Sequence, residues 1–60
     1  MKKMTYRQFT KKLAESCSRY EYAENITGHI MEMEDCYDWG AEIPEKYIKI
    51  HLPYLYQKAV

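Results

Sequence analysis

The shortness of the chain limits what it can fold into more than any other feature. A domain of 60 residues buries only about 60% of the surface that its unfolded chain exposes. Such a core rarely supplies more than about 3–5 kcal/mol, and natural chains of this size often add disulfides, a metal ion or a second copy of themselves. We therefore expect one domain over residues 1–60, with a thin core that favours a homodimer.

The cysteines and the apolar runs indicate a cellular compartment. Lys2 and Lys3 are not followed by the apolar run of a secretory signal, which favours a reducing cytoplasm. Cys17 and Cys36 are then expected to be buried thiols, since reduced Cys packs like a small apolar side chain. No apolar run approaches the roughly 20 residues that a membrane-spanning helix needs. We expect a soluble, cytoplasmic protein without a membrane partner.

A capping box opens the first predicted helix. In this motif the Thr5 hydroxyl accepts from the backbone N–H of Gln8, and the Gln8 side chain reaches back to the backbone N–H of Thr5. Apolar residues then recur at spacings of three and four, which places them on one helix face. The predicted helix covers 5–17 and buries Tyr6, Phe9, Leu13 and Cys17.

A second capping-box pattern, Ser18 to Glu21, follows almost at once and predicts a very short turn between antiparallel helices. The most regular apolar stripe of the chain comes next, and we expect it to face the core, Tyr37 included: Ala23, Ile26, Ile30, Met33 and Tyr37. Gly28 lies off this stripe. We interpret it as a weak point that costs about 1 kcal/mol relative to Ala, with close approach of another backbone as the alternative. Gly40 suits a helix end, and the predicted helix covers 18–38.

Two prolines delimit the last part of the chain. Pro44 suits the first turn of a helix, and Pro53 disfavours helical geometry just before it. The third predicted helix covers 44–51 and buries Ile43, Tyr47 and either Ile50 or Ile48. Tyr54 to Ala59 form a last helical turn or fray. The predicted fold is all-α: a small three-helix bundle with a short C-terminal helical turn.

The net charge of zero conceals a sorting of charge along the chain. Residues 1–20 carry six basic residues and one acid, residues 21–45 carry eight acids and no Lys or Arg, and residues 46–60 carry three lysines and no acid. Attraction between a basic first helix and an acidic second helix is the simplest explanation, at about 0–1 kcal/mol for each exposed pair. Two functional explanations compete with it.

The first functional explanation is a protein partner that docks on the acidic, aromatic part of the chain. Charge would speed the encounter and aromatic side chains would anchor it. The chain has seven tyrosines, more than so small a bundle buries easily, and Tyr is enriched at interfaces. The expected partner-binding residues are Glu32, Asp35, Tyr37, Asp38, Trp39, Glu42, Tyr54 and Tyr56. This predicts a non-enzymatic protein that binds or inhibits a protein partner, and its size and composition also suit an accessory protein of a phage or mobile element.

The second functional explanation is a nucleic-acid-binding regulator. A basic helix with Tyr6 and Tyr20 nearby could follow a phosphate backbone. The acidic middle of the chain argues against this, unless it faces away from the nucleic acid. The residues that would carry this alternative are Lys3, Arg7, Lys11, Lys12 and Arg19.

No residue pattern indicates catalysis or a bound cofactor. His29, Glu32 and Cys36 could share one side of a helix, but a structural zinc site has four ligands. A Cys–His pair would also need a pocket, commonly about 300–1,000 Å³, which so short a chain can scarcely enclose. Gly28 and Gly40 are the only glycines, which excludes a glycine-rich phosphate loop. We expect no catalytic residues, no metal ion and no cofactor.

The order of the predicted elements resembles a known family. An aromatic-rich first helix, a break at Trp39-Gly40, then Ile43-Pro44 and a short helix with Tyr47, Ile48, His51 and Leu52 are similar to the small YozE-type helical domains of Firmicutes. The resemblance covers most of the chain and rests on spacing. It implies a small helical fold and assigns no functional residue.

Overall fold

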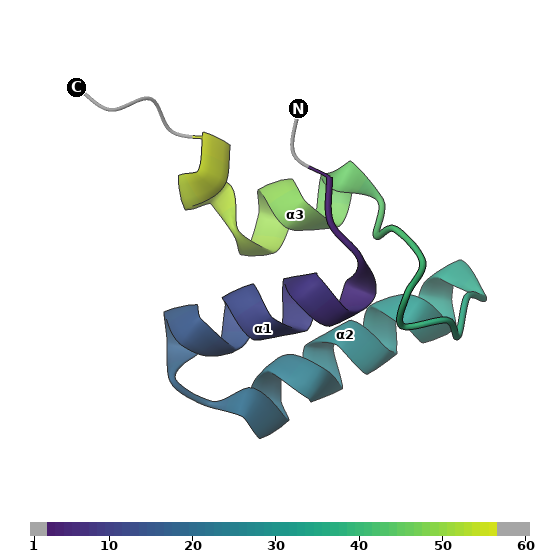
Figure 1. Ribbon diagram of the computed structural model, residues 1–60, viewed down its shortest axis with the longest axis horizontal. Coiled ribbons are helices and arrows are strands. Elements are labelled where there is room, and N and C mark those ends of the chain that lie inside the picture. Colours follow the sequence, from purple (N-terminus) through teal and green to yellow (C-terminus); the bar gives the residue numbers. More distant parts are fainter. Residues whose placement is uncertain (1–2, 57–60) are drawn as a thin grey trace.

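The computed structural model describes residues 3–56, which form three α-helices and one short 3-10 helix (Figure 1). The elements are α1 (Tyr6–Cys17), α2 (Tyr20–Glu34), α3 (Glu45–His51) and η1 (Pro53–Tyr56). Within this range the backbone forms no strand, only an isolated antiparallel bridge between Thr5 and Glu42. The predicted all-α fold, a small bundle with a helical turn after Pro53, is thereby confirmed. The rest of the predicted last turn, residues 57–59, lies outside the described residues.

α1 and α2 form an antiparallel hairpin with a very short turn (Figure 1). Ser18 closes α1 in the left-handed conformation, with a φ of 57°. Arg19 is the extended N-cap of α2, and its side chain makes no capping hydrogen bond. The predicted capping box at Ser18 is therefore wrong, because a residue that closes one helix in the left-handed region cannot supply the extended N-cap of the next.

α2 ends at Glu34, four residues before its predicted end. Asp35 turns left-handed with a φ of 53° and its N–H donates to Glu32 O, while the Cys36 N–H donates to Met31 O at 3.0 Å. This pair of bonds is a Schellman motif, which caps the last carbonyls of a helix. Tyr37 is consequently off the helix and 68% exposed, so its predicted place in the core is wrong.

The capping box at Thr5 is confirmed. The Gln8 N–H donates to Thr5 Oγ1 at 3.2 Å, and the Thr5 N–H donates to Gln8 Oε1 at 2.9 Å. A first helical turn leaves N–H groups without helical acceptors, and this motif satisfies one of them inside α1.

The α2–α3 loop, residues 35–44, satisfies the remaining donors of that turn. The Tyr6 N–H donates to Ala41 O and the Arg7 N–H to Trp39 O, both at 3.0 Å. In a third bond the loop is the donor: the Ile43 N–H donates to Met4 O, just before α1, at 3.0 Å. The loop is thus attached to the beginning of α1 before the chain enters α3.

The core lies between α1 and α2 and beneath α3. Its buried apolar residues are Met4, Tyr6, Phe9, Leu13, Ala23, Ile30, Met31, Ile43, Tyr47, Ile48 and Leu52. Tyr6, Phe9, Leu13, Ala23, Ile30, Ile43 and Tyr47 were among the predicted inward positions. Met33 is an error of that prediction, since it is 55% exposed.

Two buried threonines join α1 to α2 within the core. Thr10 and Thr27 are at most 1% exposed, and their Oγ1 atoms lie 2.6 Å apart. Thr27 Oγ1 also donates to Ala23 O at 2.9 Å, so the hydroxyls form a short chain of bonds. Because both hydroxyls have hydrogen-bond partners, the helices can approach closely here without leaving either group unpaired.

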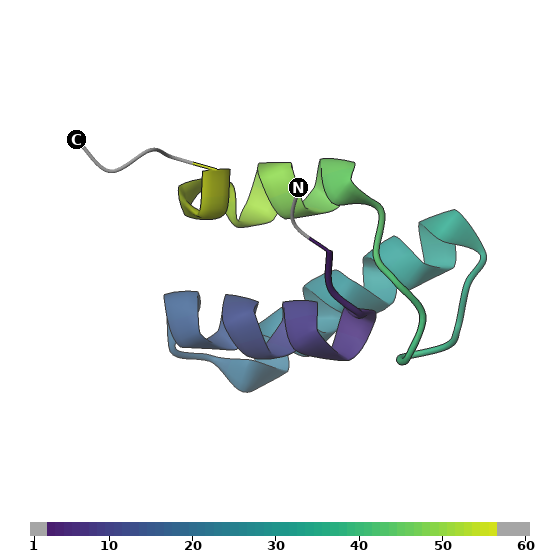
Figure 2. The same ribbon diagram turned by 45° about the horizontal axis from the view of Figure 1, so that its top comes forward.

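α3 forms a second layer over α1 and α2 (Figure 2). Ile48 of α3 and its C-cap Leu52 are fully buried, whereas Ile50 is 65% exposed. Of the two predicted alternatives, Ile48 is therefore the buried residue. The His51 ring meets the Phe9 ring edge-on, with centroids 5.9 Å apart and planes at 81°, a favourable arrangement for ring pairs. The C-terminal end of α3 therefore contacts α1 through this ring pair.

Both cysteines are thiols, but each is half-buried rather than buried as predicted. The Cys17 thiol donates to Leu13 O at 3.0 Å, near the end of α1 where the helix face opens to solvent. Cys36 lies just after the end of α2 and packs partly against the core.

Gly28 gives a direct test of the packing around α2. A β-carbon at this position would meet nothing within 4 Å, so no backbone approaches it, in agreement with its interpretation as a tolerated weak point. Gly28→Ala should raise the free energy of unfolding by about 0.5–1 kcal/mol, because Ala loses less backbone entropy in a helix. Urea unfolding followed by circular dichroism measures this, and a loss of stability would contradict an open face at Gly28.

Candidate functional site

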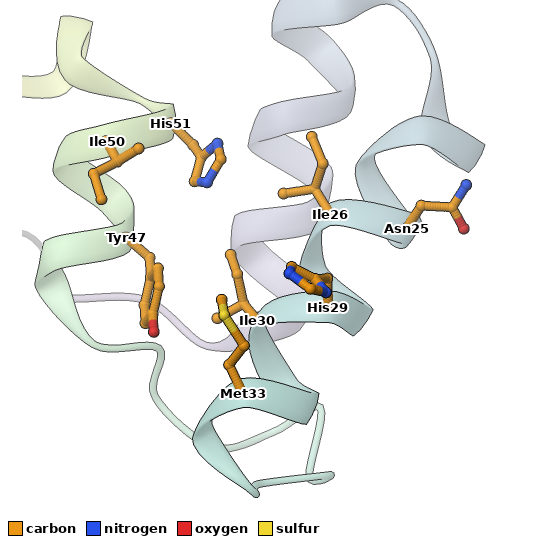
Figure 3. A pocket seen from close by; sticks show the side chains of 8 residues that line it. All are labelled: Asn25, Ile26, His29, Ile30, Met33, Tyr47, Ile50 and His51. Carbon is orange, nitrogen blue, oxygen red and sulfur yellow. The ribbon is translucent and has the colours of Figure 1, made fainter.

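An open hollow of about 450 Å³ lies between α2 and α3 (Figure 3). We call it the α2–α3 groove. It is lined by Asn25, Ile26, His29, Ile30, Met33, Tyr47, Ile50 and His51. Figure 3 shows the first five on α2 and the last three on α3, on facing sides of the hollow. Its surface is almost wholly apolar.

The α2 wall follows from helical spacing. Tyr22, Ile26, His29 and Met33 recur at intervals of four, three and four, so they share one side of α2. This side is not the one that packs on α1, where Ala23, Thr27, Ile30 and Met31 are buried. α2 therefore carries two adjacent apolar faces, and only one of them is covered.

The α3 wall is formed by a helix too short and too displaced to cover the second face. α3 has seven residues, and its buried residue Ile48, with Leu52 just after it, faces the common core. Tyr47, Ile50 and His51, at spacings of three and one, are left along the groove. The result is exposure of two aliphatic side chains, with Met33 at 55% and Ile50 at 65%.

One end of the groove holds a polar cluster. The Tyr47 hydroxyl donates to Glu34 Oε2 at 2.6 Å, and Lys46 Nζ lies 3.7 Å from the same oxygen. Lys46 Nζ also lies 5.1 Å from the centroid of the Tyr47 ring, within the range of a cation–π contact. These contacts fix the beginning of α3 level with the end of α2.

Two tyrosines at or near this cluster have a raised pKa. The hydrogen bond to Glu34 is the main cause for Tyr47, followed by burial and the negative charge of Glu34, since each favours the neutral phenol. Burial is the main cause for Tyr6, and Cys36 and Glu34 nearby add to it. Both phenols are therefore held in the neutral form below pH 10.

The groove has little chemistry of its own. It is lined by His29 and His51 but by neither Cys17 nor Cys36, so no nucleophile faces an imidazole in it. Within residues 3–56, no three His, Cys, Asp or Glu side chains gather where a metal ion could be held. Across the same part of the chain, no helix is both long and apolar enough to cross a membrane.

The acidic and aromatic residues predicted to bind a partner lie outside the groove. Exposed positions are Glu32, Asp35, Tyr37, Asp38, Glu42 and Tyr54. Trp39 is half-buried against the core, and Asp38 Oδ1 accepts from the Gly40 N–H at 2.9 Å. Tyr56 is also half-buried, and its hydroxyl donates to Glu45 Oε2 at 2.9 Å. Tyr37 is the most exposed aromatic side chain of the set.

The basic residues predicted to bind nucleic acid are all exposed: Lys3, Arg7, Lys11, Lys12 and Arg19. Arg7 lines a smaller, more polar hollow of about 230 Å³ together with Tyr20, Glu24 and Trp39. Tyr6, which was expected to stand beside these residues, is 1% exposed and part of the core. Among residues 3–56 the one ion pair is Lys46–Glu34, so no direct ion pair joins the basic side of α1 to the acids of α2.

The groove residues were not singled out from the sequence as a site. Met33 was assigned to the core, and Ile50 was one of two alternatives for burial. The available signal was the width of the apolar pattern on α2, where Ile26, Ile30, Met31 and Met33 together exceed one face. An apolar face wider than one packing surface indicates a helix that has a second apolar side, either buried or available for binding.

No protein family matches this chain, and no curated protein or solved structure is similar enough to count as a relative. The similarity to YozE-type helical domains therefore stays a prediction from residue order.

The bond between Tyr47 and Glu34 can be tested by pH. Because the pKa of folded Tyr47 is raised from its ordinary value of 10.0, its contribution to stability is complete below pH 10 and is lost as the pH rises through the folded value. Tyr47→Phe should lower the Tm at neutral pH, and its difference from the wild type should shrink above pH 10. Tyr37→Phe is the matched control at an exposed position. A difference that stays constant into alkali would contradict the bond.

Proposed function

We propose that this protein is a small non-enzymatic interaction protein that binds another protein through the α2–α3 groove. The observation that carries the proposal is that Met33 on α2 and Ile50 on α3 line an open apolar groove and are each more than half exposed. Burying apolar surface contributes roughly 25 cal/mol for each Å² removed from water. A thin-cored protein that leaves such side chains uncovered gains from any partner that covers them.

The shape and polarity of the groove favour a protein over a small molecule. Sites for small ligands bury most of the ligand and combine an apolar lining with a few placed polar groups. This groove is open along its length, and the Tyr47 hydroxyl at its end is already bonded to Glu34. An apolar ridge or helix laid along the groove fits it better, in the manner of helix-in-groove recognition.

Binding without turnover implies a stoichiometric role. A protein of this kind acts by occupying or holding its partner, as inhibitors and adaptors do. Cys17 and Cys36 remain thiols, which supports a cytoplasmic setting, since cytosolic proteins rarely carry stable disulfides. The exposed acids on and around the α2–α3 loop, among them Asp35 and Glu42, would then steer a basic partner rather than anchor it.

Capture with two matched variants tests the proposal. The protein is expressed in its host with an affinity tag beside an untagged copy, and captured proteins are identified by mass spectrometry. Ile50→Glu places a charge in the groove, and Tyr37→Glu places one on the α2–α3 loop at nearly equal exposure, 65% against 68%. We expect a stoichiometric partner, or the untagged copy, to be lost with Ile50→Glu and kept with Tyr37→Glu. The reverse pattern would assign binding to the loop, and no captured protein at all would also contradict the proposal.

One observation supports a second candidate function, nucleic-acid binding. Arg7 shares its hollow with the exposed ring of Tyr20 and with Trp39, and cationic side chains beside aromatic rings are typical of single-strand binding surfaces. Glu24 lines the same hollow and Glu15 is exposed on the same helix as Lys11. These acids repel phosphate, so the groove is the better-supported site.

Salt dependence separates the two candidates. We expect no saturable binding of a labelled single-stranded oligonucleotide at an ionic strength of about 0.15 M, measured by fluorescence anisotropy. Saturable binding that weakens steeply with added salt, and that Lys11→Glu with Lys12→Glu abolishes, would move the function to nucleic acid.

A further inference from the structure

The two edges of the α2–α3 groove carry opposite charges. On α2, Glu21 lies four residues before Asn25 and Glu32 three residues after His29, so each acid is the outward neighbour of a groove residue on the helix surface. Both acids are exposed. The α2 edge of the groove is therefore acidic.

The α3 edge is basic. Lys46 lies four residues before Ile50 and so stands beside it on the helix surface, with its side chain 65% exposed. Lys49 is also exposed, on the side of Lys46 that faces away from the groove. The groove thus separates an acidic edge from a basic edge, with Met33 and Ile50 between them.

We infer that the protein that occupies the groove is a second copy of this chain, an inference that rests on the proposed function of the groove as a protein-docking site. A two-fold axis parallel to the groove places α2 of each copy over α3 of the other. Each acidic edge then meets a basic edge, and the match occurs twice because the interface is the same on both copies. A two-fold axis across the groove would instead oppose acid to acid and lysine to lysine.

The same symmetry identifies the charges that meet. Rotation about an axis along the groove leaves each residue at the same distance along it. The contacts of Glu34 with Lys46 and Tyr47 show that the end of α2 is level with the beginning of α3. Glu32, half a turn before Glu34, therefore meets Lys46 of the second copy, while Met33 and Ile50 of both copies are covered between them.

Molar mass tests the dimer and its interface. Light scattering behind size exclusion should give twice the chain mass of 7.3 kDa for the wild type and for Tyr37→Glu, and a single chain mass for Ile50→Glu. Circular dichroism checks that Ile50→Glu keeps its helices, as expected for a side chain that is exposed in the single chain. A dimer that survives Ile50→Glu would place the interface elsewhere and overturn the inference.

Charge exchange tests the orientation. Glu32→Lys creates two like-charge lysine pairs in the proposed dimer, and Lys46→Glu creates two like-charge acid pairs, so each variant alone should dimerise about tenfold more weakly. An equimolar mixture of the two restores both opposite-charge pairs and should form a mixed dimer with near wild-type affinity, measured by sedimentation equilibrium. Two weakened variants that do not rescue each other would overturn the axis along the groove.

The outcomes distinguish this inference from the proposed function. In one outcome, the wild type keeps the mass of one chain at every concentration measured by light scattering, while Ile50→Glu loses a captured protein. This result contradicts the second copy and leaves the groove as a docking site for another protein. A protein that forms neither dimer nor complex through the groove contradicts both.

Discussion

The hydrogen bonds between the α2–α3 loop and the beginning of α1 determine the rest of this structure. The backbone donors of Tyr6 and Arg7 have no acceptor within α1, as at any helix N-terminus, and here loop carbonyls accept them. A separate helix of seven residues is far too short to be stable alone. α3 is helical because the loop delivers it onto the core, where Ile48 and Leu52 are buried.

This attachment also explains the groove. The loop is bonded to the beginning of α1 just before it enters α3. The Tyr47–Glu34 bond and the Lys46 ion pair are the polar contacts that join the beginning of α3 to the end of α2. Toward its C-terminal end, α3 diverges from the second apolar face of α2. The exposed Met33 and Ile50 are thus a consequence of how the chain returns to its own beginning.

Local signals in the sequence predicted local structure well. The capping box at Thr5 and the spacing of Tyr6, Phe9 and Leu13 correctly placed the first helix, since both depend on neighbours within two turns. Ser18 and Tyr37 were misplaced because two non-glycine residues, Ser18 and Asp35, adopt left-handed backbone to end α1 and α2, and side-chain patterns give little sign of that. The apolar pattern of α2 gave a sign of one wall of the groove, but its α3 wall could not be predicted. The carbonyls of Ala41 and Trp39 accept the backbone bonds that position α3, and such bonds do not depend on the side chains of these residues.

The position of Trp39 has an optical consequence. It is the chain's single tryptophan, it packs partly against the core, and its own carbonyl is one of the acceptors that anchor the loop to α1. Its fluorescence therefore reports the attachment of that loop, while ellipticity at 222 nm is dominated by α1 and α2. Comparing the two signals during denaturation distinguishes release of the loop and α3 from melting of the hairpin, without introducing a probe.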